Sequence, residues 1–188
     1  MEAFLSSTAL VALAEIGDKT QLLALVLAAR FRRPLPIVAG ILVATLANHA
    51  LAAWLGASAA AWLSGPWFGA AVAAGFIVMG LWTLIPDTLG EDETPRARGG
   101  VFLTTLVAFF LVEIGDKTQL ATVALGARYE SVLAVTAGTT LGMLLANVPV
   151  VLAGEALIRR VPLHAVRIAA ATVFVATGAW LLWRSWPL

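Results

Sequence analysis

The sequence predicts an all-α membrane protein with six transmembrane helices, arranged as two inverted three-helix repeats. Of its 188 residues, 61% are apolar and only 12% are charged, and the mean hydropathy is +0.93. Soluble domains usually carry about a quarter charged residues, so this composition indicates a membrane protein. In addition, the octapeptide EIGDKTQL occurs twice, at positions 15–22 and 113–120, each time inside a long apolar segment.

Six segments are long and apolar enough to be spans, since a transmembrane helix needs about 20 apolar residues. They are Phe4 to Ala29, Pro34 to Gly56, Pro66 to Pro86, Val101 to Ala127, Ser131 to Gly154 and Ala165 to Trp186. Pro66 suits the first turn of a helix, and Pro149 is expected to kink the fifth span. Because the first residues lack the basic region of a cleavable signal peptide, the first span is expected to remain in the membrane.

The two halves of the chain are related beyond the octapeptide. At a constant offset of 98 residues the matching pairs are Arg30 and Arg128, Gly40 and Gly138, Gly56 and Gly154, Phe76 and Phe174, Gly80 and Gly178, and Trp82 and Trp180. The segment 46–48 resembles 145–147 at an offset of 99. We therefore expect a single transmembrane domain, 1–188, made of repeat 1 (1–90), a cytoplasmic linker (87–99) and repeat 2 (99–188).

Three spans per half is an odd number, so the second half should enter the membrane upside down. Many secondary transporters have this plan, with the binding site at the midplane where the halves meet. Duplicated bundles can also arise for packing alone. The best-matched segment is the least compatible with lipid, however, because charged residues at bilayer depth are costly.

Orientation follows from the arginines, which gather in cytoplasmic loops. The loops after spans one, three and five contain Arg30, Arg32, Arg33, Arg96, Arg98, Arg159, Arg160 and Arg167. The opposite side has only Arg128 and Arg184, so both termini are predicted to be extracytoplasmic. The tryptophans expected near the outer interface are Trp54, Trp62, Trp67, Trp183 and Trp186.

The repeated octapeptide supplies the candidate ion ligands. On a continuous helix, with about 100° per residue, Glu15, Asp18 and Lys19 share one face and Thr20 points elsewhere. Gln21 flanks Asp18 and could add an amide oxygen. The second copy repeats this with Glu113, Asp116, Lys117 and Gln119. If the halves are related by a two-fold axis, Glu15, Asp18, Glu113 and Asp116 should surround one point.

Four carboxylates form a hard-oxygen site, which suits Ca²⁺, Mn²⁺ or Mg²⁺. The octapeptide has no His, Cys or Met, which argues against copper and, less strongly, against zinc. Four carboxylates and two lysines leave a charge of −2, which one divalent cation neutralises. Without the metal, such close carboxylates must take up protons. Protons and metal then compete for the same oxygens, which is the minimum requirement for a cation/proton antiporter.

Several other residues have two interpretations. Gly17 and Gly115 could mark local unwinding or close helix packing. Lys19 and Lys117 could pair with Glu15 and Glu113 one turn back and tune their charge. Asn48 and Asn147 could line the ion path or form interhelical contacts, and His49 is expected to be a polar packing residue. The acidic linker residues could be solvated or could collect cations at the cytoplasmic mouth; they are Asp87, Glu91, Asp92 and Glu93. Gly138 and Gly142 are expected to form a helix contact face.

The motifs Glu15–Thr20 and Glu113–Thr118 both fit the signature Glu-x-Gly-Asp-(Lys/Arg)-(Thr/Ser). In these motifs, and across essentially the whole chain, the sequence resembles the Gdt family of cation exchangers, which includes Golgi, chloroplast and bacterial members. The resemblance implies exchange of Mn²⁺ or Ca²⁺ for protons, with the four motif acids as the cation site. The short linker and the lack of an N-terminal extension resemble a bacterial inner-membrane manganese exporter.

The sequence therefore predicts a secondary transporter that exports divalent cations by proton-coupled alternating access, with metal ions as substrate and no cofactor. The alternatives are Ca²⁺ as the main substrate, an intramembrane acid- or metal-dependent enzyme, and a structural scaffold. The enzyme is disfavoured because the chain offers no His cluster and no cysteine. With a net charge of +1 and no basic tract, nucleic acid is not expected as a partner, and the sequence does not predict the oligomeric state.

Overall fold

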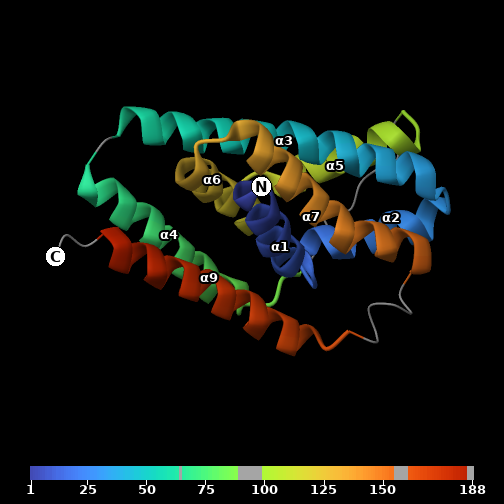
Figure 1. The fold of residues 1–188 in the computed structure, drawn as a ribbon. Helices are drawn as coiled ribbons and strands as arrows, with labels where there is room; N and C mark the ends of the chain where they lie inside the picture. The colour runs from blue at the N-terminus through green and yellow to red at the C-terminus, as the bar shows by residue number, and fades with distance from the viewer. Residues whose placement is uncertain (64, 89–98, 155–160, 186–188) are drawn as a thin grey trace.

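A computed structural model describes residues 1–63, 65–88, 99–154 and 161–185, and these residues form helices without strands. The helices are α1 (Glu2–Glu15), α2 (Lys19–Phe31), α3 (Pro34–Trp62), α4 (Pro66–Thr83), α5 (Val101–Glu113), α6 (Lys117–Tyr129), α7 (Val132–Ala153) and α9 (Leu163–Ser185) (Figure 1). The all-helical prediction is confirmed. Among these residues, α3, α7 and α9 are each long and apolar enough to cross a membrane, and α4 and α5 are apolar but shorter.

The first predicted span is not one continuous helix. It consists of α1 and α2, which are separated by three residues at the centre of the first octapeptide. Gly17 adopts a φ of +83°, a conformation that glycine tolerates and L side chains rarely adopt. Ile16 and Asp18 on either side are extended, so the helical hydrogen-bond ladder is interrupted.

The fourth predicted span is divided in the same way. α5 ends at Glu113, α6 begins at Lys117, and Gly115 between them has a φ of +76°. The prediction of two continuous helices, 4–29 and 101–127, was therefore wrong. Of the two interpretations of Gly17 and Gly115, local unwinding is the one that the structure confirms.

The other predicted spans correspond to single helices with shifted ends. α3 continues past Gly56 to Trp62, because the alanine-rich sequence after the glycine favours a helix. α4 begins at Pro66, as predicted, and ends at Thr83. α7 begins after Ser131 and contains Pro149. α9 begins at Leu163, and the predicted end at Trp186 lies outside the described residues.

The two halves are interleaved rather than stacked. A methyl group added at Gly40 of α3 would lie 2.9 Å from the carbonyl oxygen of Phe102 in α5. One added at Gly138 of α7 would lie 2.5 Å from the carbonyl oxygen of Phe4 in α1. Phe102 and Phe4 are themselves 98 residues apart, so equivalent glycines allow equivalent close contacts with the opposite half. Gly142 also packs on α1, which confirms the predicted contact face.

The α4–α9 pair shows the same correspondence. These helices lie side by side along one edge of the molecule (Figure 1). The rings of Phe76 and Phe174 meet at a centroid distance of 6.2 Å. Methyl groups at Gly80 and Gly178 would lie 2.9 Å and 2.6 Å from carbonyl oxygens of the facing helix. Together with Gly40 and Gly138, three of the residue pairs predicted from the sequence repeat therefore occupy matching positions in the fold.

Some predictions concern residues outside the described part of the chain. These are Glu91, Asp92, Glu93, Arg96, Arg98, Arg159, Arg160 and Trp186. The other four belt tryptophans, Trp54, Trp62, Trp67 and Trp183, are exposed by 55% to 87%. Large exposed apolar side chains of this kind are suited to contact with lipid.

Candidate metal centre

The two octapeptides meet inside the protein through the ends of the broken helices. Glu15 is the last residue of α1 and Glu113 is the last residue of α5. Asp18 and Asp116 precede the first residues of α2 and α6. All four carboxylates are at most 3% exposed. Each helix break therefore has one acid at the end of the first helix and one just before the start of the next, at the junction of the two halves.

Three of the four predicted carboxylates converge on one point. One oxygen from each of Glu15, Glu113 and Asp116 lies within 4.8 Å of the other two. Two ligand oxygens on opposite sides of an ion, each about 2.2 Å from it, would be about 4.4 Å apart. The three carboxylates can therefore hold one small divalent cation after a slight inward movement. Their chemistry fits a hard cation such as Mn²⁺, Mg²⁺ or Ca²⁺.

Asp18 lies outside this group of three, so the prediction that all four acids surround one point is only partly right. Its Oδ1 atom accepts a hydrogen bond of 2.6 Å from the backbone N–H of Lys19 and so caps the start of α2. Its Oδ2 atom is buried and has no hydrogen-bond partner among the described residues. A continuous helix could not have produced this arrangement, because the cap exists only where α2 begins.

Glu15 is held by hydroxyl groups from both halves. The hydroxyl of Thr20 donates to Oε2 of Glu15, and the hydroxyl of Thr118 donates to Oε1. Both threonines are fully buried. The helical-wheel prediction that Thr20 points elsewhere was wrong, because the break at Gly17 rotates α2 relative to α1. Hydrogen bonds to a charged acceptor are among the strong ones, so these hydroxyls favour an ionised Glu15.

Glu113 and Asp116 retain unused ligand atoms. Oε2 of Glu113 and Oδ2 of Asp116 are buried and have no hydrogen-bond partner among the described residues. Oε1 of Glu113 lies 3.4 Å from Nε2 of His49, which is fully buried in α3. Buried polar atoms normally have partners, and an unpartnered buried carboxylate oxygen suggests a cation-binding position.

The lysines do not pair with the glutamates one turn back, and that prediction was wrong. Nζ of Lys19 lies 3.7 Å from Oδ1 of Asp116 in the other octapeptide. Lys117 forms an ion pair with Asp87, which follows α4. Asp87 is therefore part of the site's surroundings and not a purely solvated linker residue. The lysines connect one half to the other and to the end of α4.

The glutamines support the backbone of the breaks. Oε1 of Gln21 accepts a hydrogen bond of 2.9 Å from the N–H of Gly17, and Oε1 of Gln119 accepts one of 2.7 Å from Gly115. The amide oxygens thus satisfy N–H groups that lost their helical partners, instead of flanking Asp18 as predicted. Nε2 of Gln21 also donates to the carbonyl of Ala146 in α7, at 3.0 Å.

The two asparagines have different environments. Nδ2 of Asn48 donates to the carbonyl of Phe110 at 3.0 Å, which is an interhelical contact between α3 and α5. Nδ2 of Asn147 lies 3.4 Å from Oε2 of Glu15 and donates to the carbonyl of Met143 at 3.0 Å. Only Asn147 therefore contacts the acidic cluster directly.

The sequence model of the GDT1 family, described as a divalent cation/proton antiporter, matches residues 3–91 and matches again at 101–187. The chain belongs to the GDT1 family. Each half thus carries the family's pattern, with one octapeptide in each. The family assignment agrees with the resemblance that the two motifs indicate, and it makes the protein a membrane transporter of the cation/proton antiporter class.

Individual relatives match along 82% to 95% of the chain. A protein of Vibrio cholerae, provisionally named as a manganese exporter, is 52% identical over 93% of this chain and 88% of its own length. GDT1-like protein 5 of Arabidopsis thaliana is 28% identical, over 95% and 94% of the two chains. A GDT1-like protein of Synechocystis is 28% identical, over 82% of this chain and 84% of its own. No solved structure matches the chain significantly.

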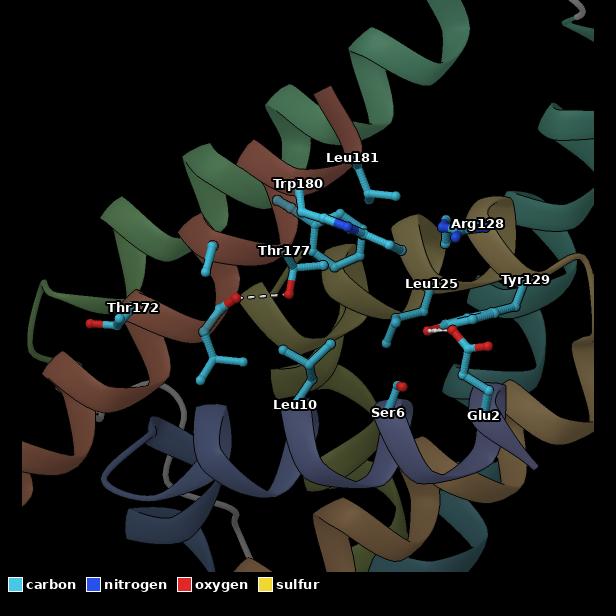
Figure 2. Close-up of a pocket in the computed structure, with 13 residues that line it drawn as sticks. Glu2, Ser6, Leu10, Leu125, Arg128, Tyr129, Thr172, Thr177, Trp180 and Leu181 are labelled. Atoms are coloured by element: carbon cyan, nitrogen blue, oxygen red, sulfur yellow. Dashed lines mark hydrogen bonds between the residues drawn. The ribbon is translucent and has the colours of Figure 1, made fainter. Parts of the chain in front are cut away.

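A separate cavity of about 520 Å³ lies between α1, α6 and α9 of this GDT1-family protein (Figure 2). Leu10, Leu125 and Trp180 line it, and the hydroxyl of Tyr129 reaches the carboxylate of Glu2 at its rim. The motif acids do not line this cavity. Its largely apolar lining makes it unsuitable for a bare divalent cation.

Three residues that contact the acidic cluster were not among the predicted ligands of this GDT1-family site. They are Thr20, Thr118 and His49. The threonines belong to the octapeptide and could have been found by treating Gly17 and Gly115 as helix breaks. His49 has no counterpart of its own type in the second half, so the repeat gave no signal for it.

Proposed function

We propose that the protein exports Mn²⁺ from the cytoplasm in exchange for protons, using Glu15, Glu113 and Asp116 as cation ligands. Asp18 is the fourth acid of the site and comes into contact with the ion when the transporter changes conformation. The observation that supports this proposal most directly is the cluster of three buried carboxylates with unpartnered oxygens on Glu113 and Asp116.

Proton coupling follows from the same cluster. Three carboxylates at this distance and depth repel one another and are poorly solvated, so an empty site must take up protons. A divalent cation binds the same oxygens and releases those protons. Exchange of cation for protons therefore needs no proton-binding groups other than these carboxylates.

Alternating access is supported by an asymmetry between the halves. α4 packs on α6, and α9 packs on α1. The pairs related to these by the sequence repeat, α9 with α2 and α4 with α5, have little or no contact. In transporters with inverted repeats, one half or bundle rocks against the other around a fixed site. We propose that the α4–α9 pair moves between these two sets of contacts, and that the repeats are inverted with six crossings in total.

Manganese is favoured as the cargo by the name of the relative from Vibrio cholerae. We place the protein in a bacterial inner membrane, surrounded by lipid, with both termini extracytoplasmic. This topology is open to a direct test because the chain has no cysteine. Single cysteines at Arg32 and Trp62 should be labelled by membrane-impermeant maleimide from the cytoplasmic and external sides, respectively. Labelling from the same side would contradict the six-crossing arrangement.

The function is tested by cation flux in proteoliposomes under an imposed pH gradient, with Mn²⁺, Ca²⁺ and Mg²⁺ compared. The wild type should move Mn²⁺ in the direction opposite to the flow of protons down their gradient. Glu15→Gln and Asp116→Asn should abolish that movement. If the wild type moves no ion, the transport proposal is wrong. If both variants transport normally, the site is wrong, and flux that ignores the pH gradient would rule out antiport.

A further inference from the structure

Two side chains from outside the octapeptides lie next to the acidic cluster, the imidazole of His49 and the carboxamide of Asn147. Nε2 of His49 in α3 is 3.4 Å from Oε1 of Glu113. Nδ2 of Asn147 in α7 is 3.4 Å from Oε2 of Glu15. His49 and Asn147 are 98 residues apart, as are Glu113 and Glu15. Each helix thus presents a side chain from the same repeat position to the glutamate of the other half.

This correspondence corrects the sequence alignment of the repeats at this point. The letters Leu-Ala-Asn suggested that Asn48 matches Asn147, at an offset of 99. In the fold, however, Asn48 faces the carbonyl of Phe110, and His49 takes the position that Asn147 has in the other half. The first half therefore carries an imidazole where the second half carries a carboxamide.

We propose that His49 is a ligand of the transported ion, through Nε2, and that it makes the site select Mn²⁺ over Ca²⁺. This proposal rests on the proposed function. Glu113 and Asp116 complete the same side of the site with their unpartnered oxygens. The ion then lies closer to the second octapeptide than to the first, where hydroxyl groups already occupy both oxygens of Glu15.

The geometry is suited to a shared ion. Two ligands about 2.2 Å from one cation and at right angles to each other are about 3.1 Å apart. The 3.4 Å between Nε2 of His49 and Oε1 of Glu113 corresponds to a slightly wider angle. His49 is fully buried, and Glu113 is its only hydrogen-bonding contact among the described residues. The imidazole is therefore already aimed at the acidic cluster.

The chemistry of the donor explains the selectivity. Ca²⁺ and Mg²⁺ take oxygen ligands almost exclusively, whereas first-row transition ions also accept imidazole nitrogen. The octapeptides provide only oxygen ligands, which bind all three ions. One neutral imidazole adds a donor that Mn²⁺ can use and Ca²⁺ uses poorly. Mn²⁺ and Ca²⁺ are thus separated by a residue outside both motifs.

Pulsed electron paramagnetic resonance of Mn²⁺ bound to the purified full chain tests the ligand directly. The chain has two histidines, His49 and His164, and His164 is exposed at the start of α9. Nitrogen modulation should appear in the wild type and should change when histidine is labelled with ¹⁵N. It should persist in His164→Asn, the matched control, and disappear in His49→Asn. Bound Mn²⁺ in the wild type without histidine modulation would overturn the proposal, and this measurement needs no variant to fold.

Competition flux in proteoliposomes tests the selectivity. Loss of a direct ligand should lower the preference for Mn²⁺ over Ca²⁺ by about tenfold or more in His49→Asn, while His164→Asn keeps the wild-type ratio. An unchanged ratio in an active His49→Asn variant would overturn the selectivity proposal and leave the transport proposal intact. A wild type that binds and moves neither ion would overturn both.

Discussion

The hydroxyl of Thr118 should be required for tight cation binding, although Thr118 is not expected to touch the ion. It donates a hydrogen bond to Oε1 of Glu15, and both residues are fully buried. A hydrogen bond to a charged group is worth about 1.5–3 kcal/mol. In Thr118→Val the shape is kept, but an ionised Glu15 loses that stabilisation and becomes more costly to hold ready for the metal.

If the whole loss appears in binding, the affinity for Mn²⁺ should fall by between about tenfold and about a hundredfold, since each 1.4 kcal/mol is a factor of ten. Isothermal titration of the purified protein with Mn²⁺ measures this change. Thr118→Ser keeps the hydroxyl and should bind nearly as tightly as the wild type. Thr122→Val is the matched control, because among the described residues the buried hydroxyl of Thr122 bonds only to the carbonyl of Thr118 within α6.

If Thr118→Val bound Mn²⁺ as tightly as the wild type, the proposed role of the Thr118 hydroxyl would be refuted. It would also be refuted if Thr122→Val lost as much affinity as Thr118→Val, because the effect would then come from general damage to α6. A drop that Thr118→Ser fails to restore would likewise show that the hydroxyl is not the cause.

Two further predictions concern the surroundings of the acids. Gly17→Ala and Gly115→Ala should each destabilise the protein by about 1–2 kcal/mol, because both glycines have positive φ. Gly17→Ala should have the lower melting temperature by tryptophan fluorescence, since its methyl group would lie 3.1 Å from Leu163, whereas nothing lies within 4 Å at Gly115; equal melting temperatures would contradict this. Asp87→Asn should weaken Mn²⁺ binding severalfold in the same titration, because Lys117 would lose its partner and compete for the acids; unchanged affinity would show that the ion pair is irrelevant to the site.

Much of the fold could be predicted from composition and repetition. The apolar segments mark where helices occur, and glycines spaced 98 residues apart identify matching contacts such as those of Gly40 and Gly138. The helix breaks were harder to predict, because local unwinding and close packing use the same residue. Only the backbone conformation of Gly17 distinguishes these possibilities, and that conformation depends on the chain around it.

The candidate site was predicted in its acids but not in its geometry. A buried charge inside an apolar segment is visible in any sequence, so Glu15, Glu113 and Asp116 could be identified directly. The predicted side-chain directions assumed a continuous helix. Because the helix is broken at Gly17, Thr20 contacts Glu15 instead of pointing away from it. The partners of Lys19 and Lys117 lie in distant segments, and sequence spacing could not reveal them.

In the proposed transport cycle, protons and Mn²⁺ exchange at the same carboxylates. This exchange can be measured by imposing a Mn²⁺ gradient, without a pH gradient, across proteoliposomes that contain a pH-sensitive dye. In the wild type, Mn²⁺ moving down its gradient should drive protons in the opposite direction, and Glu113→Gln should abolish both movements. Mn²⁺ flux without proton movement, or proton movement that persists in Glu113→Gln, would contradict exchange at these carboxylates.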